Sequence, residues 1–198
     1  MDRPVSVHPG DLIWSGEHWI LGICPDDSEE PSGWVSLFHT RYSPAGEGTT
    51  AQVMIPGEPG VSVIAADCPE VARFTTEQFL SRGSFFDADA PLVNARFERR
   101  GDLRSDPGWR IETDAFTLIA RWQLTEPPVI ADGTFRAGTE HYTVLFFTDA
   151  ASVELDGRRI EGQPYPRDIW EPTIGGQRSS CVIALAETLV ELPPGSAS

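Results

Sequence analysis

Apolar and polar residues alternate along much of this 198-residue chain. In the clearest run, from Phe116 to Leu124, every second residue is apolar and most of the residues between them are polar. A strand would gather the apolar side chains on one face, whereas a helix would scatter them around its circumference. We therefore predict a β-strand here, with Phe116 and Trp122 on the same face.

Shorter apolar runs recur through the chain and predict further strands. In the run from Trp34 to Tyr42, Trp34 and Phe38 fall on one face and His39 falls on the other. Pro-Gly pairs at 56–57 and 59–60, which favour turns, separate two of these runs. The remaining runs cover residues 18–23, 52–55, 61–65, 94–99, 109–113 and 142–147.

Three local signals add to this picture. The Asp-Gly pair at 156–157, between alternating arms over residues 152–160, predicts a hairpin turn, because both residues tolerate the positive φ that it requires. Residues 75–83 open with a capping-box pattern and close on glycine, which predicts one short helix. Residues 181–192 suit either a helix or a returning strand, and we favour a strand through about Glu187.

Short strands separated by turn signals, with one short helix, predict an all-β fold. We expect a single antiparallel β-barrel of the lipocalin-like, calycin type with about 8–10 strands, and we keep a β-sandwich as the alternative. The length suits one domain over residues 1–198, with an ordered core from about 5 to 190 and a flexible C-terminal tail over 193–198.

The chain is strongly acidic, with a formal net charge of −15 and a pI near 4.5. Such a surface repels nucleic acid and anionic membrane, so neither is an expected partner.

All 15 basic residues are Arg, which rules out a lysine Schiff base and a P-loop lysine and suggests a bacterial genome of high GC content. We find no signal peptide and no apolar run of membrane-spanning length, so we expect a cytoplasmic protein.

No catalytic motif stands out. The three Cys are widely spaced and no two of the four His sit at metal-ligand spacing, so we expect neither a disulfide framework nor a metal site. Nucleotide-binding glycine patterns and a nucleophile elbow are also missing, so we expect no cofactor. The six Trp, ten Phe and three Tyr either fill the interior or line a cavity for an apolar molecule.

The middle of the chain carries a resemblance to a known family. It consists of Ala95–Glu98, then a strand led by Trp109, then a long strand from Trp122 that ends in a Pro-Pro pair at 127–128. This succession resembles the hydroxyneurosporene-synthase-like lipocalin family, near which the natural-product Diels–Alderases with paired lipocalin-like domains belong. The resemblance implies a lipocalin-like barrel. It transfers no active-site residue, because members of that group often have two barrels and this chain has length for one.

The stretch from Gly162 to Cys181 is the strongest candidate for a binding loop. Its prolines stiffen the backbone, and a stiff loop orders its side chains at lower entropic cost. Tyr165 and Asp168 are the candidate catalytic residues, because a phenol and a carboxylate can hydrogen-bond to carbonyl or hydroxyl groups. The same stretch would also suit a connection that plugs one barrel end. The expected substrate-binding side chains are Trp170, Trp122, Phe116, Trp34, Phe38, His39 and Tyr142.

Two functions fit these features. The first is a cofactor-independent cyclase or isomerase, similar to a Diels–Alderase, which holds an apolar natural-product intermediate in a reactive conformation inside a barrel cavity. The alternative is a lipocalin-like protein that binds a hydrophobic small molecule without turnover. In both, the expected partner is an apolar small molecule. An interaction domain with a filled core, forming a homodimer, is a third reading.

Overall fold

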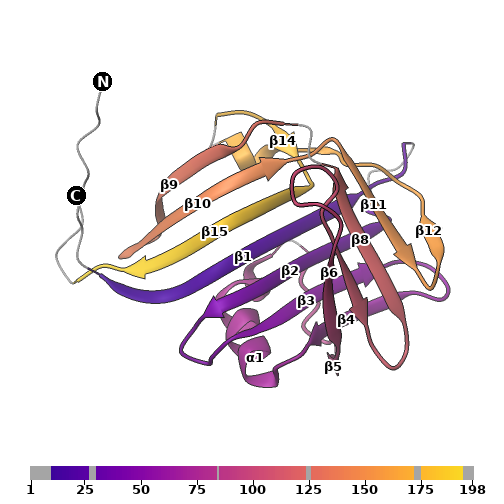
Figure 1. The fold of residues 1–198 in the computed structure, drawn as a ribbon, viewed down its shortest axis with the longest axis horizontal. Coiled ribbons are helices and arrows are strands. Elements are labelled where there is room, and N and C mark those ends of the chain that lie inside the picture. Colours follow the sequence, from indigo (N-terminus) through magenta and orange to yellow (C-terminus); the bar gives the residue numbers. More distant parts are fainter. Residues whose placement is uncertain (1–9, 27–29, 84, 124–125, 172–174, 194–198) are drawn as a thin grey trace.

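The computed structural model describes residues 10–26, 30–83, 85–123, 126–171 and 175–193 (Figure 1). Residues 5–9 of the expected core and 194–198 of the expected tail lie outside these ranges. The elements, in chain order, are β1 (Asp11–Ile23), β2 (Gly33–Tyr42), β3 (Gly48–Ile55), β4 (Val61–Ala66), α1 (Pro69–Gln78), η1 (Leu80–Arg82), β5 (Leu92–Asn94), β6 (Arg96–Arg100), β7 (Gly108–Glu112), β8 (Thr117–Gln123), β9 (Val129–Arg136), β10 (Thr139–Phe147), β11 (Ala150–Leu155), β12 (Arg158–Ile160), β13 (Pro166–Arg167), η2 (Asp168–Trp170), β14 (Arg178–Ser179) and β15 (Val182–Glu191).

The strands form two main sheets and one short ribbon, which confirms the all-β prediction. The larger sheet has eight strands in the order β5-β4-β3-β2-β1-β15-β10-β9, and the smaller has five in the order β12-β11-β8-β7-β6. Closure into a single barrel is not confirmed, because the described strands pair as separate sheets. One apolar core joins the two main sheets face to face, as in the sandwich alternative.

The period-two pattern of β8 explains how the sheets meet. Leu118, Ala120 and Trp122 have no exposed surface, whereas Arg121 and Gln123 between and after them are exposed. The predicted alternation is therefore confirmed as far as Gln123, and its last residue, at position 124, lies outside the described ranges. Figure 1 shows β8 and β11 crossing the strands of the larger sheet at a steep angle.

Three indoles fill the space between the sheets. Trp19 of β1 meets Trp109 of β7 and Trp122 of β8 edge to face, with ring centroids 5.8 and 5.2 Å apart. The Trp122 Nε1–H donates a 2.8 Å hydrogen bond to the carbonyl oxygen of Ile20, which links β8 of one sheet to β1 of the other. These aromatic residues make a solid core at this point, so Trp122 does not line a cavity between the sheets.

The chain passes between the two main sheets four times, and two of these passages, β5 to β6 and β10 to β11, are short corners. Ala95 alone separates β5 from β6, and its N–H donates a 2.8 Å bond to the carbonyl oxygen of Ala66 in β4. Thr148 lies between β10 and β11, and its N–H donates a 3.1 Å bond to the carbonyl oxygen of Cys181. These bonds tie both corner residues to the larger sheet or to the segment that leads into β15.

We call the face of the larger sheet that is turned away from the smaller sheet the outer face. Part of it is covered by α1 and η1. Apolar side chains of β1, β2 and β4 pack there against phenylalanines of the helical segment; the buried members of this cluster are Trp14, Phe38, Ile64, Leu80 and Leu189. The amphipathic strands thus bury apolar groups on both of their faces.

The helix begins earlier in the chain than predicted. α1 starts at Pro69, with Cys68 as the preceding cap residue, and Thr75, the expected cap, is fully buried inside it. Proline suits the first position of a helix, because its fixed φ is helical and its missing N–H would have no partner within the helix. The capping-box pattern at 75–78 was therefore a misleading start signal.

Two other local predictions are confirmed. Asp156 and Gly157 have φ values of 51° and 77° and connect β11 to β12, as the Asp-Gly pair predicts for a two-residue hairpin. The favoured strand in the C-terminal region is also right, since β15 pairs with both β1 and β10. It extends beyond Glu187 to Glu191.

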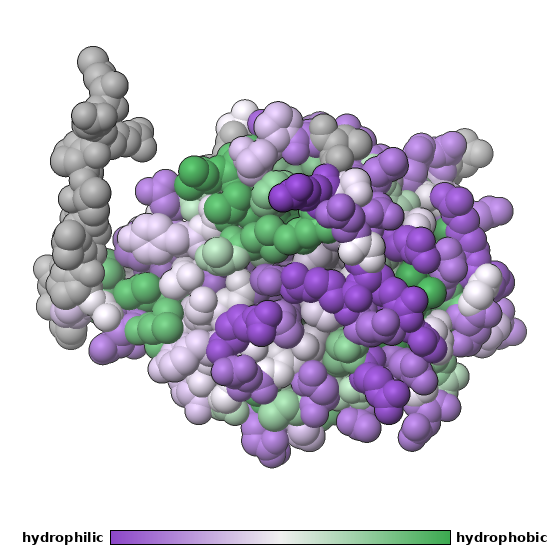
Figure 2. All heavy atoms as spheres, viewed as in Figure 1, coloured by the Kyte–Doolittle hydropathy of each residue, from purple (hydrophilic) through white to green (hydrophobic). Residues whose placement is uncertain are grey.

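The smaller sheet leaves part of the larger one uncovered. Figure 2 shows an apolar area over β9, β10 and β15, where Ile130 is 79% exposed and Tyr142 38% exposed. Tyr142, predicted to bind substrate, therefore lies on an open surface. Within the described residues, no helix is long and apolar enough to cross a membrane.

Replacing Trp122 by Phe should destabilise the fold by about 2 kcal/mol, because the Ile20 carbonyl loses its indole donor and a smaller ring leaves a gap in the core. Urea titration followed by far-ultraviolet circular dichroism measures this change. Tyr42→Phe is the matched control, since Tyr42 is 45% exposed and should change stability by less than about 0.5 kcal/mol. Equal stability of the two variants would contradict the role assigned to the indole.

Candidate functional site

Four polar side chains meet on the outer face of the larger sheet, and we call them the polar cluster: His18 of β1, Ser36 of β2, His141 of β10 and Glu187 of β15. Ser36 Oγ lies 2.9 Å from His18 Nε2. His18 Nδ1 lies 3.9 Å from Glu187 Oε2, and His141 Nε2 lies 2.8 Å from Glu187 Oε1. The four residues thus form a continuous row across four neighbouring strands.

The electrostatics of the polar cluster keep His18 neutral. Burial lowers its pKa from 6.5 to about 4, with a smaller opposing effect from Glu187 and a further lowering from His141. A neutral imidazole carries one N–H and one acceptor nitrogen, so it can donate to a carboxylate while accepting from a hydroxyl. This is the protonation state that a general base needs at neutral pH.

Aromatic rings border the polar cluster on the side of the helix. Phe38 stacks on the His18 ring, with centroids 3.8 Å apart and planes 16° apart, and Phe79 stacks on Phe38 at 5.0 Å. Further along β2, Trp34 contacts Phe85, and the Arg167 guanidinium lies over both of these rings. The outer face therefore places an acid–base group beside flat apolar walls.

Tyr165, a predicted catalytic residue, lies on this same face. A side chain at Gly22 of β1 would come within 2.9 Å of the Trp34 ring and 3.3 Å of the Tyr165 hydroxyl, so glycine leaves room for both. The hydroxyl is buried and has no hydrogen-bond partner among the described residues. Burial raises the pKa of this phenol, so it stays a donor at neutral pH.

A second candidate site is a cleft of about 660 Å³ at one end of the two sheets. Its walls come from β4 and the edge strand β5 and from the β7–β8 and β11–β12 turns. The apolar lining residues are Pro59, Val61, Val63, Val93, Ala115, Phe116 and Leu155. Asn94, Thr113 and Asp114 supply polar groups, so the cleft combines an apolar wall with a few hydrogen-bonding positions.

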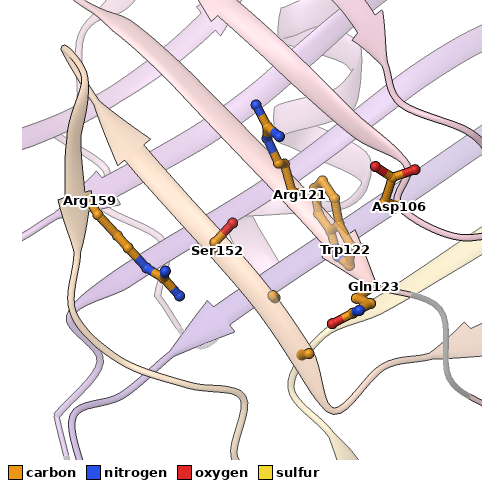
Figure 3. Close-up of a pocket in the computed structure, with 8 residues that line it drawn as sticks. Asp106, Arg121, Trp122, Gln123, Ser152 and Arg159 are labelled. Carbon is orange, nitrogen blue, oxygen red and sulfur yellow. The ribbon is translucent and has the colours of Figure 1, made fainter.

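A smaller, polar hollow of about 250 Å³ lies over β8 and β11 of the smaller sheet. Figure 3 shows Arg159 on one side of it and Asp106 on the other, with Ser152 and Arg121 between them. Trp122 borders it, although the indole itself is buried between the sheets. Its lining mixes the charged side chains of Asp106, Arg121 and Arg159 with apolar surface from Trp122, Ala150 and Ala151.

No family model matches the chain, and no curated protein matches it. Any assignment of function therefore depends on these sites themselves. Within the described ranges, no three His, Cys, Asp or Glu side chains converge closely enough to hold a metal ion.

The sequence-predicted site residues do not form one site. Tyr165, Trp34 and Phe38 share the outer face, whereas Phe116 lines the cleft. His39 occupies the inner side of β2, where its ring lies 5.4 Å from Trp109 and its Nδ1 is 3.0 Å from Thr49 Oγ1. The expectation of a single cavity lined by all of these residues is therefore not met.

The predicted binding loop lies over the outer face instead of plugging the end of the sheets. Trp170 packs edge to face on Phe147 of β10, with ring centroids 5.2 Å apart, and joins an apolar cluster there. Asp168 is exposed and accepts a hydrogen bond from Gln177 within the same segment. Residues 172–174 of the loop are outside the described ranges.

None of His18, Ser36, His141 and Glu187 is among the site residues predicted from the sequence. Their separation along the chain hides them, because motif searches look for residues at short, fixed spacings. One usable signal was present: His18 stands at the start of an apolar run in β1, and a titratable group in such a position needs a partner when it is buried.

Lowering the pH should destabilise the fold through His18. Between pH 6.5 and about 4 the unfolded chain binds a proton that the folded chain does not, so stability should fall across this range by at most about 3 kcal/mol. Glu187 opposes and His141 reinforces this effect. Urea titrations at several pH values should show a smaller fall in His18→Gln than in the wild type. Equal falls in both would contradict the neutral state of His18.

Proposed function

We propose that the protein binds a small apolar molecule in the cleft at the end of the two sheets. The observation that carries this proposal is the size and lining of the cleft, about 660 Å³ with a largely apolar wall. Small-molecule sites usually measure roughly 300–1,000 Å³ and combine apolar walls with few polar groups. An apolar ligand would gain about 25 cal/mol for each Å² of apolar surface that it removes from water.

The architecture around the cleft supports a lipocalin-like role. At the Ala95 corner the chain runs directly from the larger sheet into the smaller one, so this end resembles the open end of a barrel. The core indoles fill the space deeper between the sheets, so we expect the ligand to sit at the mouth. The side chains of Asn94 and Thr113 would orient a ligand that carries one hydrogen-bonding group.

Turnover of the bound molecule, by cyclisation or isomerisation without a cofactor, is the second candidate function. The feature that favours it is the position of the Asn94 amide and the Asp114 carboxylate beside the apolar wall. Confinement of a reactive conformer, with hydrogen bonds to developing charge, can accelerate such reactions. Tyr165 and Asp168 do not line this cleft, so turnover here would not use them.

Val63→Asp should weaken binding of the neutral dye N-phenyl-1-naphthylamine by at least about tenfold, because the new carboxylate would lose hydration in an apolar wall. Fluorescence titration measures the affinity. Ile130→Asp is the matched control, since it places the same charge on the exposed apolar area over β9 and should leave the affinity unchanged. If only Ile130→Asp weakened binding, the open surface and not the cleft would be the site.

Incubation of the protein with apolar polyenes that carry a carbonyl group would separate binding from turnover. A product of unchanged mass and altered retention time, formed by the wild type and lost in Val63→Asp, would support the cyclase or isomerase reading. A ligand recovered unchanged would favour binding without turnover.

A further inference from the structure

The polar cluster has the geometry of a nucleophile, a base and an orienting group in a row. Ser36 Oγ lies at hydrogen-bond distance from one nitrogen of His18, and Glu187 faces the other nitrogen at 3.9 Å. The diagnostic arrangement for nucleophilic catalysis is a hydroxyl within about 2.6–3.2 Å of a base that a third group orients, and these contacts are often looser without a ligand. The 2.9 Å distance between Ser36 Oγ and His18 Nε2 meets this criterion.

Glu187 is held in a way that suits the orienting role. Its Oε1 lies 2.8 Å from His141 Nε2, which fixes the carboxylate. Its Oε2 is buried and has no hydrogen-bond partner among the described residues, although it is directed toward His18 Nδ1. A buried carboxylate oxygen without a partner is costly. A small shift of either side chain would close this contact and leave Nε2 of a neutral His18 free to accept the Ser36 proton.

We propose that Ser36 is the nucleophile of an acyl-transfer centre, with His18 as its general base and Glu187 as the residue that positions His18. The substrate class is an ester with a small aromatic or apolar acyl group. Phe38 and Trp34 flank Ser36 along the outer face of β2, and they would contact such a group. The His18 and Glu187 side chains retain 18% and 14% exposure and Ser36 retains 6%, so the row meets solvent mainly at His18 and Glu187.

In the first step, Ser36 Oγ attacks the carbonyl carbon of the ester and its proton passes to His18 Nε2. The bond from the carbonyl carbon to the alcohol oxygen then breaks, and the alcohol leaves with the proton from His18. Water next attacks the acyl-serine and gives its proton to His18. The bond to Ser36 Oγ breaks, Ser36 recovers the proton, and a carboxylic acid is released.

The Tyr165 hydroxyl is positioned to stabilise the negative oxygen of the tetrahedral intermediate. It lies over Gly22, which is a diagonal cross-strand neighbour of Ser36, a relation that places two residues about 7–8 Å apart. The hydroxyl is a buried donor with no hydrogen-bond partner among the described residues. The Trp34 ring borders this hydroxyl at Gly22, and a hydroxyl donor of this kind bonds more strongly to a carbonyl oxygen as negative charge develops on that oxygen.

This centre is independent of the proposed ligand cleft. Ser36 lies on the outer face of β2, whereas Val61 and Val63 of the cleft face the smaller sheet. Failure of dye binding in the cleft would leave acyl transfer untouched, and failure of acyl transfer would leave the cleft untouched.

The test is covalent labelling of the full chain with diisopropyl fluorophosphate, followed by intact-mass and peptide mass spectrometry. We expect one diisopropylphosphoryl group on Ser36. Labelling in His18→Gln should be slower by about 100-fold or more, because the general base is lost. Ser152→Ala, which removes a strand serine on the smaller sheet, should label as the wild type does. A wild-type protein that remains unlabelled, or is labelled on another residue, would overturn the proposal.

Hydrolysis of p-nitrophenyl acetate supplies a second readout that separates the roles. Ser36→Ala should abolish enzyme-dependent release of p-nitrophenol, and Tyr165→Phe should lower kcat by about 100-fold while the protein can still be labelled on Ser36. Glu187→Gln should lower kcat and retain the label, as a positioning residue would. Thermal melts of each variant identify those that fail to fold. Unchanged hydrolysis in a folded Ser36→Ala variant would also overturn the proposal.

Discussion

The hydrogen bond from the Trp122 indole to the Ile20 carbonyl is the interaction on which the rest of the structure depends. It joins β8 of the smaller sheet to β1 at the centre of the larger sheet, in the middle of a cluster of edge-to-face indoles. A bonded N–H at a fixed point on β1 leaves little freedom for one sheet to slide over the other. Because side chains alternate along a strand, the same contact that turns Trp19 inward turns His18 outward.

The outer face obtains its acid–base row through an irregularity in β15. The register of β15 shifts opposite both β1 and β10, and Ala186 between these shifts has a φ of 52°. A bulge of this kind changes which residues face each side, so Ala184 and Glu187 both lie on the outer face although three positions separate them. Without the bulge, strict alternation would direct Glu187 toward the opposite face, away from both histidines.

The sequence was informative where the determining contacts are local. The Asp-Gly pair at 156–157 and the alternation in β8 predict their structures because turn dihedrals and strand faces depend on neighbouring residues. The polar cluster could not be predicted from the sequence, because its residues come together only through the pairing of β1 with β2 and β15 and through the bulge at Ala186. Period-two logic applied to β15 would have excluded Glu187. The helix start was available from Pro69, but the capping-box pattern drew attention to a later position.

The filled interior determines where a ligand can bind. With Trp19, Trp109 and Trp122 packed between the sheets, the centre offers no room for a ligand, so sites form at the margins of the core. The cleft forms at the end of the two sheets beside the Ala95 corner, and the polar cluster forms on the face that the smaller sheet does not cover. On the outer face, the helical segment and the segment around Tyr165 cover the side chains that the smaller sheet leaves uncovered. Partial burial by such cover is what lowers the pKa of His18 while leaving the row in contact with solvent.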